Sequence, residues 1–426
     1  LPAEQQMKAR SELLRQLATV QRSMTDMRGA LASLEEMLRV ASAANDRRME
    51  VVALIDLSRA LAWLDRRRCL DIAQEALANS RRLGDPILES IALGNWGGWN
   101  ILLDRWREDY ARASDESLKT ARASANPMLL YTRLTLHIHV EIFASHYRTA
   151  WETAQEAMEI ASQLGDGYMY IAGHYFGALA LLHLGEWGTL QDLLQRAVVV
   201  VERNGAGESW LSWYRVGIGW LHCEALDFET AKALCEVPPG TMPEELAALI
   251  AIDTSAILGK ACLGLGDAAR AIACFEAVVR TEQDETLPIR RNFFFPAYAG
   301  LSEAWLAQGE LAKARDYAQR LHDFSAGAPE RTYLALSHRL FAEIALREHA
   351  LAEAETHLTT ALGLVEAAEV PLAAWRVYAS AAKLYEQLLR PAEAAIYQRR
   401  SADVRFQLAA SLDETDPLRR SIVGLG

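Results

Sequence analysis

The feature that most constrains this chain is a set of helix-breaking positions that recurs about every forty residues. The recurring dipeptides Ala44-Asn45, Gly84-Asp85, Ala125-Asn126 and Gly165-Asp166 lie 40, 41 and 40 residues apart, and Pro288, Pro329 and Pro371 lie 41 and 42 apart. Asparagine, glycine and proline at such points end one helix and begin the next, because each favours backbone geometry that a helix interior rejects. The chain is therefore expected to be one array of repeats.

Each interval between these positions has the pattern of two amphipathic helices joined by a short turn. Gly266-Asp267 and Gly309-Glu310 are examples of the inner turn. Helix pairs are predicted over 5–43, 46–83, 86–124, 127–164, 167–204, 207–237, 243–283, 289–326, 330–368 and 371–409. Without a convincing strand pattern, residues 1–410 are expected to form a single all-α array, and residues 411–426 a C-terminal tail.

Small residues at a fixed spacing indicate how the two helices of a pair meet. A small residue in the first helix is followed twelve positions later by alanine in the second, as in Gly219 and Ala231, Gly259 and Ala271, Ser302 and Ala314, and Ala342 and Ala354. Two crossing helices can approach closely only where neither carries a bulky side chain. Pro296 interrupts one helical pattern, where it must either start a helix or kink a long one.

This pattern of small residues around a Gly-Asp or Gly-Glu turn resembles the tetratricopeptide repeat over nearly the whole chain. The resemblance implies a right-handed α-solenoid, a superhelix of about ten helix pairs. The units are longer than the usual 34 residues and are similar to those in the sensor regions of MalT-type signal-transducing NTPases, the STAND class. The stretch from Leu408 to Ser421 also resembles the C-terminal ending of bacterial ATPase or cyclase regulators. Because the chain starts at Leu1 rather than Met, we expect it to be part of a longer protein with an NTPase module and an output domain.

Composition excludes several classes of partner. The formal net charge is −12, which disfavours direct binding of nucleic acid. No apolar run approaches the length needed to cross a bilayer, so we expect no membrane contact. The five cysteines contain no C-x-x-C pair, which is typical of buried thiols in a reducing compartment. The expected location is cytoplasmic.

The sequence also offers little for catalysis. It contains no G-x-x-x-x-G-K-[ST] phosphate loop, no H-E-x-x-H and no G-x-S-x-G. His137 and His139 are two apart on a predicted helix and so point to different faces, although His137 and Glu141 could share one. We therefore expect no catalytic residue, no metal and no cofactor.

Binding is expected on the concave surface, which the first helices of successive pairs line in this architecture. These helices are rich in aromatic and hydrogen-bonding residues, and the twelve-residue spacing places some of them on the face turned away from the partner helix. The candidate binding residues are His139, Tyr175, Trp213, Trp220, Arg291 and Arg339, with Lys260, Glu303 and Glu343 on the same face. Aromatic planes beside Arg and His suit a peptide, a sugar, a nucleotide or another ligand. Packing between long helices is the alternative for each aromatic residue.

Two functions follow from this interpretation. The first is a non-catalytic sensor that binds a small-molecule inducer or regulatory protein in the concave groove and relays the event to an absent NTPase or output module. The second is an adaptor that docks a peptide or partner protein. The ends of the array offer a further surface through which copies could form an oligomer.

Overall fold

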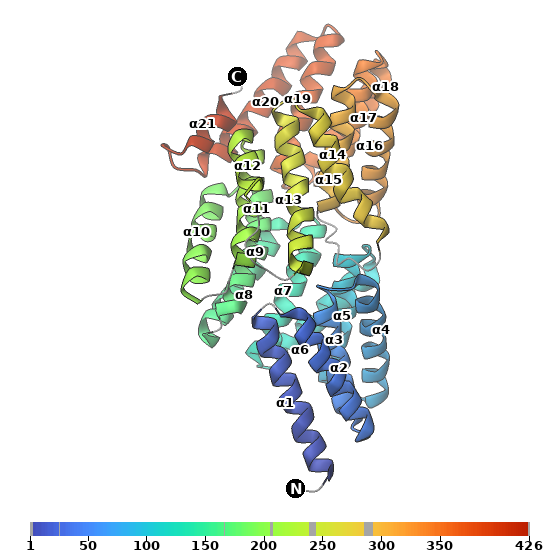
Figure 1. The fold of residues 1–426 in the computed structure, drawn as a ribbon. Coiled ribbons are helices and arrows are strands. Elements are labelled where there is room, and N and C mark those ends of the chain that lie inside the picture. The colour runs from blue at the N-terminus through green and yellow to red at the C-terminus, as the bar shows by residue number, and fades with distance from the viewer. Residues whose placement is uncertain are drawn as a thin grey trace.

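The computed structural model describes residues 3–24, 26–165, 167–204, 208–237, 244–284 and 293–424, and these are helical throughout apart from turns and loops (Figure 1). The helices are α1 (Ala3–Ser23), α2 (Met27–Ala43), α3 (Arg47–Leu61), α4 (Arg66–Leu83), α5 (Pro86–Leu103), α6 (Glu108–Ala123), α7 (Pro127–Phe143), α8 (Tyr147–Leu164), α9 (Gly167–Leu184), α10 (Trp187–Asn204), α11 (Glu208–Glu224), α12 (Phe228–Cys235), α13 (Glu244–Gly264), α14 (Ala268–Arg280), the 3₁₀ turn η1 (Thr281–Gln283), α15 (Phe294–Ala307), α16 (Leu311–Ala326), α17 (Thr332–Arg347), α18 (Leu351–Glu366), α19 (Pro371–Gln387), α20 (Pro391–Ala410) and α21 (Pro417–Val423).

The helices form ten successive pairs, from unit one (α1–α2) to unit ten (α19–α20), so the predicted all-α array of about ten helix pairs is confirmed. Each predicted pair coincides with one observed pair to within a few residues. The short sixth pair is also found, because α12 ends at Cys235. The last pair ends at Ala410, the residue before the predicted tail 411–426, and this segment contains the short helix α21.

Local capping explains why the helices begin and end where the sequence predicts. Asp46, Asp85 and Asp267 each accept backbone N–H groups in the first turn of the helix that follows. Gly84 ends α4 with φ of 71°, a left-handed conformation that costs glycine little. Pro296 lies in the first turn of α15, where its missing N–H would have no partner inside the helix, so it starts this helix and does not kink it.

The crossings within pairs occur at the small residues. In unit eight the Ser302 hydroxyl donates a hydrogen bond of 2.8 Å to the carbonyl oxygen of Ala314, which brings the side chain of one helix against the backbone of the next. In unit nine Ala342 and Ala354 are both fully buried. The close approach inferred from the twelve-residue spacing is therefore present in the structure.

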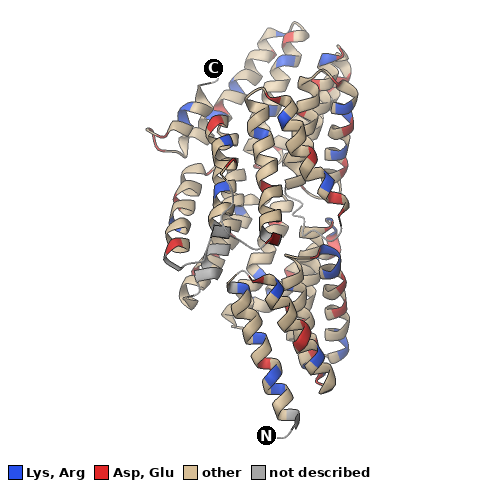
Figure 2. Ribbon diagram, in the orientation of Figure 1, with Lys and Arg blue, Asp and Glu red and all other residues tan. Residues whose placement is uncertain are grey.

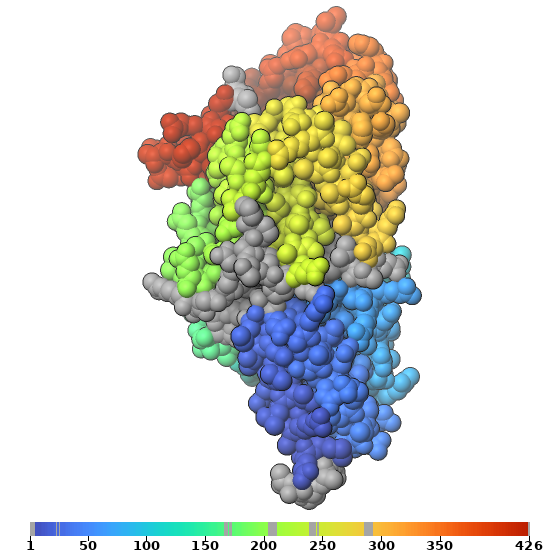
Figure 3. Space-filling model, viewed as in Figure 1, coloured from blue at the N-terminus to red at the C-terminus, as the bar shows by residue number. Residues whose placement is uncertain are grey.

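The first helices of neighbouring units also contact one another, as α11, α13, α15, α17 and α19 do in turn. They form the inner layer of the superhelix, and the second helices lie outside it (Figure 1). On the face shown in Figure 3, the N-terminal units fill the lower half, and units six to ten with the C-terminal tail fill the upper half. Acidic and basic residues are interspersed along most helices (Figure 2).

The expectation that no apolar run approaches the length needed to cross a bilayer is wrong. Within α13, the run Ala247–Gly264 is long and apolar enough to cross a membrane by length and composition. This helix packs against α11, α12, α14 and α15 in the array, and 44% of the run is buried there. Packing on these sides accounts for the buried part of the run.

The superhelix is wound tightly enough for units four and five to contact units nine and ten. The Tyr147 hydroxyl, at the start of α8, hydrogen bonds with the Thr332 hydroxyl at 2.7 Å, and Ser145 donates to the buried Glu330 carboxyl at 3.1 Å. Directly after α9, the carbonyl oxygen of Gly185 accepts a hydrogen bond of 3.0 Å from the Ser411 hydroxyl. We call this contact region, at residues 145–148, 185–188, 330–332, 369 and 408–411, the seam.

Gly188 is the most sensitive position of the seam, because a Cβ there would overlap the carbonyl oxygen of Ser411. We predict that Gly188→Ala lowers the free energy of unfolding by about 1–3 kcal/mol, the usual cost of overpacking. Gly217→Ala in α11 is the matched control, because nothing lies within 4 Å of its added Cβ. That change should raise stability by roughly 0.5–1 kcal/mol, as expected for a helix interior. Urea unfolding of both variants checks the prediction, and equal effects would contradict it.

Candidate binding cavity on the concave face

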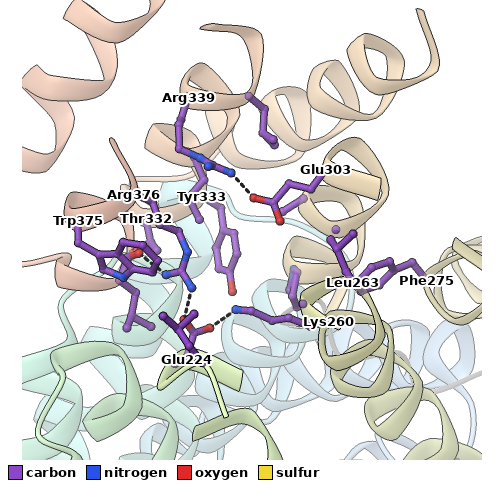
Figure 4. Close-up of a pocket in the computed structure, with 18 of the residues that line it drawn as sticks. Glu224, Lys260, Leu263, Phe275, Glu303, Thr332, Tyr333, Arg339, Trp375 and Arg376 are labelled. Atoms are coloured by element: carbon purple, nitrogen blue, oxygen red, sulfur yellow. Dashed lines mark hydrogen bonds and ion pairs between the residues drawn. The ribbon is translucent and has the colours of Figure 1, made fainter. Parts of the chain in front are cut away.

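The inner layer of units six to ten encloses a cavity of about 170 Å³. Its walls come from the first helices α11, α13, α15, α17 and α19, with additions from the α11–α12 turn, α12 and α14 (Figure 4). The lining residues are Glu224, Leu226, Phe228, Lys260, Leu263, Gly264, Phe275, Pro296, Ala299, Gly300, Glu303, Thr332, Tyr333, Leu336, Arg339, Leu340, Leu372, Trp375 and Arg376. The cavity therefore lies on the surface that the sequence predicts to be concave.

The apolar part of the wall combines buried and accessible side chains. Leu263, Leu336 and Trp375 are half-buried, so part of each faces the open space. Phe275 is fully buried behind them, and its ring lies so close to Gly300 that a Cβ at that glycine would overlap it. The absence of a side chain at Gly300 is what allows the aromatic ring to complete this wall.

The polar part of the wall is organised around Glu224, the last residue of α11. Its carboxylate accepts a hydrogen bond from the Trp220 indole at 3.1 Å, pairs with Lys260 of α13, and accepts one from the Arg376 guanidinium of α19 at 2.9 Å. Arg376 also lies over the Trp375 ring, 4.2 Å from its centroid. Figure 4 shows Lys260 and Arg376 on either side of Glu224.

The surroundings of Glu224 decide its protonation state. Burial by itself would raise the pKa of this carboxyl, but the charges of Lys260 and Arg376 and their hydrogen bonds outweigh burial and lower the pKa to about 2. Glu224 is therefore a carboxylate at neutral pH. His183 of α9 lies behind this group, and burial lowers its pKa to about 4, so it is neutral there.

Ion pairs and hydrogen bonds connect successive first helices at separations of 36 or 37 residues, slightly less than one repeat. Glu224 and Lys260 are 36 residues apart, Glu303 and Arg339 are also 36 apart, and Glu343 accepts from Ser380, 37 residues on, at 2.6 Å. Each pair joins one unit to the next across the inner layer. Arg376 differs, because it reaches 152 residues back to Glu224 and connects unit ten with unit six.

The candidate residues from the sequence are distributed over several places. Arg339 lines the cavity, and Trp220 lies behind its wall as a donor to Glu224. His139 is buried against Phe176, with ring centroids 4.5 Å apart. Arg291 lies outside the described residues. Among the described residues that the sequence placed on the binding face, Arg339 is thus on the cavity surface, together with Lys260 and Glu303.

Tyr175 and Trp213 do not lie on an open surface, which differs from the expectation. The Trp213 ring is 5.9 Å from Tyr175 of unit five and 5.6 Å from Trp63 of unit two, and only 2% of Trp213 is exposed. The tight winding of the superhelix causes this burial, because it packs the inner faces of units two, five and six against one another. Their role in binding stays a prediction.

Sequence reasoning missed Glu224 and Tyr333. A glutamate at the end of a helix resembles a solvated surface residue, and the signal that could have identified it is its 36-residue distance from Lys260. Tyr333 lies in the first turn of α17, and its ring stacks on Phe295 with centroids 4.8 Å apart. Its position beside the cavity depends on how units eight and nine pack, which no local pattern shows.

The histidines considered as metal ligands have protein partners. His137 Nε2 lies 2.9 Å from Glu141, and His137 Nδ1 lies 3.2 Å from the Ser114 hydroxyl. Over the described parts of the chain, no group of three His, Cys, Asp or Glu side chains is arranged to hold a metal ion. The five cysteines are free thiols, four buried and Cys274 half-buried.

The fold is that of a tetratricopeptide-like α-solenoid with a cavity in its inner layer. The solved structure of a Rap protein complexed with competence and sporulation factor has the same fold, with a TM-score of 0.63 and 16% identity over 86% of this chain and 99% of that one. The apo form of RapI (TM-score 0.44, 11% identity, 87% and 99% covered) and the APC/C hetero-tetramer Cut9-Hcn1 (0.47, 11%, 97% and 96%) are less similar. No family model and no curated protein matches the sequence.

Glu224 gives the cavity a testable pH dependence. Its folded-state pKa of about 2 lies below the ordinary value of 4.5, so its stabilising contribution is present above pH 4.5 and is lost as the pH falls toward 2. We predict that Glu224→Gln lowers the free energy of unfolding at pH 7 by about 3–5 kcal/mol, because two partly buried cations lose their counter-ion. The difference from the parent chain should shrink at pH 3 in urea titrations. A difference that stays constant between pH 7 and pH 3 would contradict the assignment.

Proposed function

We propose that this chain is a binding protein that holds a peptide segment of a partner in the cavity of units six to ten. The observation that carries the proposal is the composition of the wall. Accessible apolar side chains lie beside charged groups held in place by buried ion pairs, an arrangement that accepts an apolar side chain and orients the polar backbone around it. This corresponds to the adaptor interpretation of the sequence.

The dimensions of the cavity support a peptide as the ligand. A volume of about 170 Å³ suits one large apolar side chain, and most of a peptide would then lie along the inner layer. Half-buried Leu226 and Phe228 extend the apolar surface on one side, and Trp375 on another. Deeply held apolar anchors with polar surroundings are typical of peptide recognition by helical grooves.

The charged groups argue against acid–base catalysis at this site. A catalytic acid or base works best with a pKa near the operating pH, whereas the pKa of Glu224 is about 2. Glu224 and Glu303 are each paired with a cation. A non-catalytic role is therefore part of the proposal.

The similar Rap structure, solved as a complex with competence and sporulation factor, supports a binding role for an array of this shape. A sensor that relays binding to an NTPase module, expected from the resemblance to STAND proteins, would use the same cavity. That relay, a small-molecule inducer and a cytoplasmic location stay predictions from the sequence.

The test is a selection of random twelve-residue peptides displayed on phage, with the whole chain as the bait. Selected peptides are then labelled and titrated by fluorescence anisotropy. We predict that Leu336→Trp, which fills the cavity, weakens their binding at least tenfold, or about 1.4 kcal/mol. Ile396→Trp is the matched control, because Ile396 is exposed on α20 and does not line the cavity.

Melting curves establish that both variants are folded. Undiminished binding to Leu336→Trp, or an equal loss in Ile396→Trp, would show that the peptides bind elsewhere. Failure of the selection to yield any specific peptide would contradict the proposed function itself.

A further inference from the structure

The lining of the cavity has more cationic than anionic groups. Three cations line it, Lys260, Arg339 and Arg376, against the two carboxylates of Glu224 and Glu303. The excess of one positive charge contrasts with the formal net charge of −12 for the whole chain. The cavity is thus a locally positive site in a negative protein.

The excess arises because two cations share one carboxylate. Lys260 and Arg376 both pair with Glu224, whereas Arg339 has Glu303 for itself. Glu343 of α17 does not line the cavity; it pairs with Lys383 at 3.0 Å, and the charge of Arg339 also acts on it. His183, the titratable group behind the wall, is neutral at pH 7, since burial lowers its pKa to about 4.

The shared carboxylate is also less accessible than its partners. The Glu224 side chain is 4% exposed, whereas that of Lys260 is 25% exposed and that of Arg376 13%. Lys260 and Arg376 are therefore more accessible to a ligand than Glu224 is. In Figure 4 the two cations lie on different sides of Tyr333. Lys260 is on the side of the apolar residues Leu263 and Phe275, and Arg376 is on the opposite side.

Apolar side chains lie directly beside these cations. Trp375 contacts Arg376, and Leu263 is one turn along α13 from Lys260. A ligand that fills the apolar space thus places its neighbouring groups against the two cations. In this partly buried setting a charge-assisted hydrogen bond is stronger than a neutral one.

We infer that the ligand presents a carboxylate next to its apolar anchor, and that Lys260 and Arg376 bind this carboxylate. The inference rests on the proposed function and names the chemistry of the peptide. The carboxylate can come from an Asp or Glu side chain within the segment or from the carboxy terminus of the chain. Both sources provide the same two acceptor oxygens, so the cavity does not distinguish them by charge.

The experiment selects peptides from two random libraries with the whole chain as the bait. In one library the peptide has a free carboxy terminus, and in the other both ends are joined to the display protein. We expect Asp or Glu next to an apolar residue to be enriched in the closed library. In the open library, terminal apolar residues without an acidic neighbour would identify the carboxy terminus as the source.

The strongest binder of each kind is then synthesised with its carboxylate and with the matching amide, as a Glu→Gln or a terminal amide change. The amide should bind at least tenfold more weakly. Lys260→Gln should remove this difference between the two peptides, and Lys313→Gln should keep it. Lys313 is the matched control, because it loses the same charge on the outer helix α16, away from the cavity.

The outcomes separate the two proposals. Peptides that bind in the cavity, without enrichment of carboxylates and with equal affinity for acid and amide forms, overturn this inference and leave the proposed function standing. A selection without any specific peptide overturns both. The comparison of acid and amide peptides needs no change in the protein, so it decides the matter even if Lys260→Gln fails to fold.

Discussion

The close crossing of two helices at small side chains is the constraint on which the whole array depends. Where Ser302 meets Ala314, a side chain of one helix contacts the backbone of the other, and both residues are fully buried. The same crossing, repeated along the chain, gives each pair a similar geometry. Because the pairs are similar, their stacking produces a regular superhelix with the first helices inside.

The tight winding of this superhelix explains both the seam and the buried aromatic residues. Contacts such as Tyr147 with Thr332 join residues 185 positions apart, so the inner faces of distant units become neighbours. Between units two, five and six, Trp63, Tyr175 and Trp213 fill the space between those faces. In units six to ten the inner layer leaves the cavity open.

The cavity has its chemical character because a buried carboxylate holds several helices together. Glu224 connects α11, α13 and α19 through Lys260 and Arg376, and it is ionised because these cations outweigh the effect of burial on its pKa. Breaking such a group costs stability, since a buried charge would be left without its partner. The same arrangement leaves positive charge at the mouth of an apolar space. Stability and the proposed selectivity for a ligand therefore come from one set of residues.

The sequence by itself determined the helices, their pairing and the crossing points. These depend on residues within about forty positions of one another, such as Asp267 at the start of α14 or Ala314 opposite Ser302. Such short-range relations are visible as a repeating pattern in one sequence. It also indicated Arg339 as a residue of the inner face. The tertiary structure alone decided that Trp213 is buried against Trp63 and that Arg376 reaches Glu224 across 152 residues. The physical reason is that the pitch of the superhelix is a sum of small rotations between units, and no local pattern of residues specifies that sum.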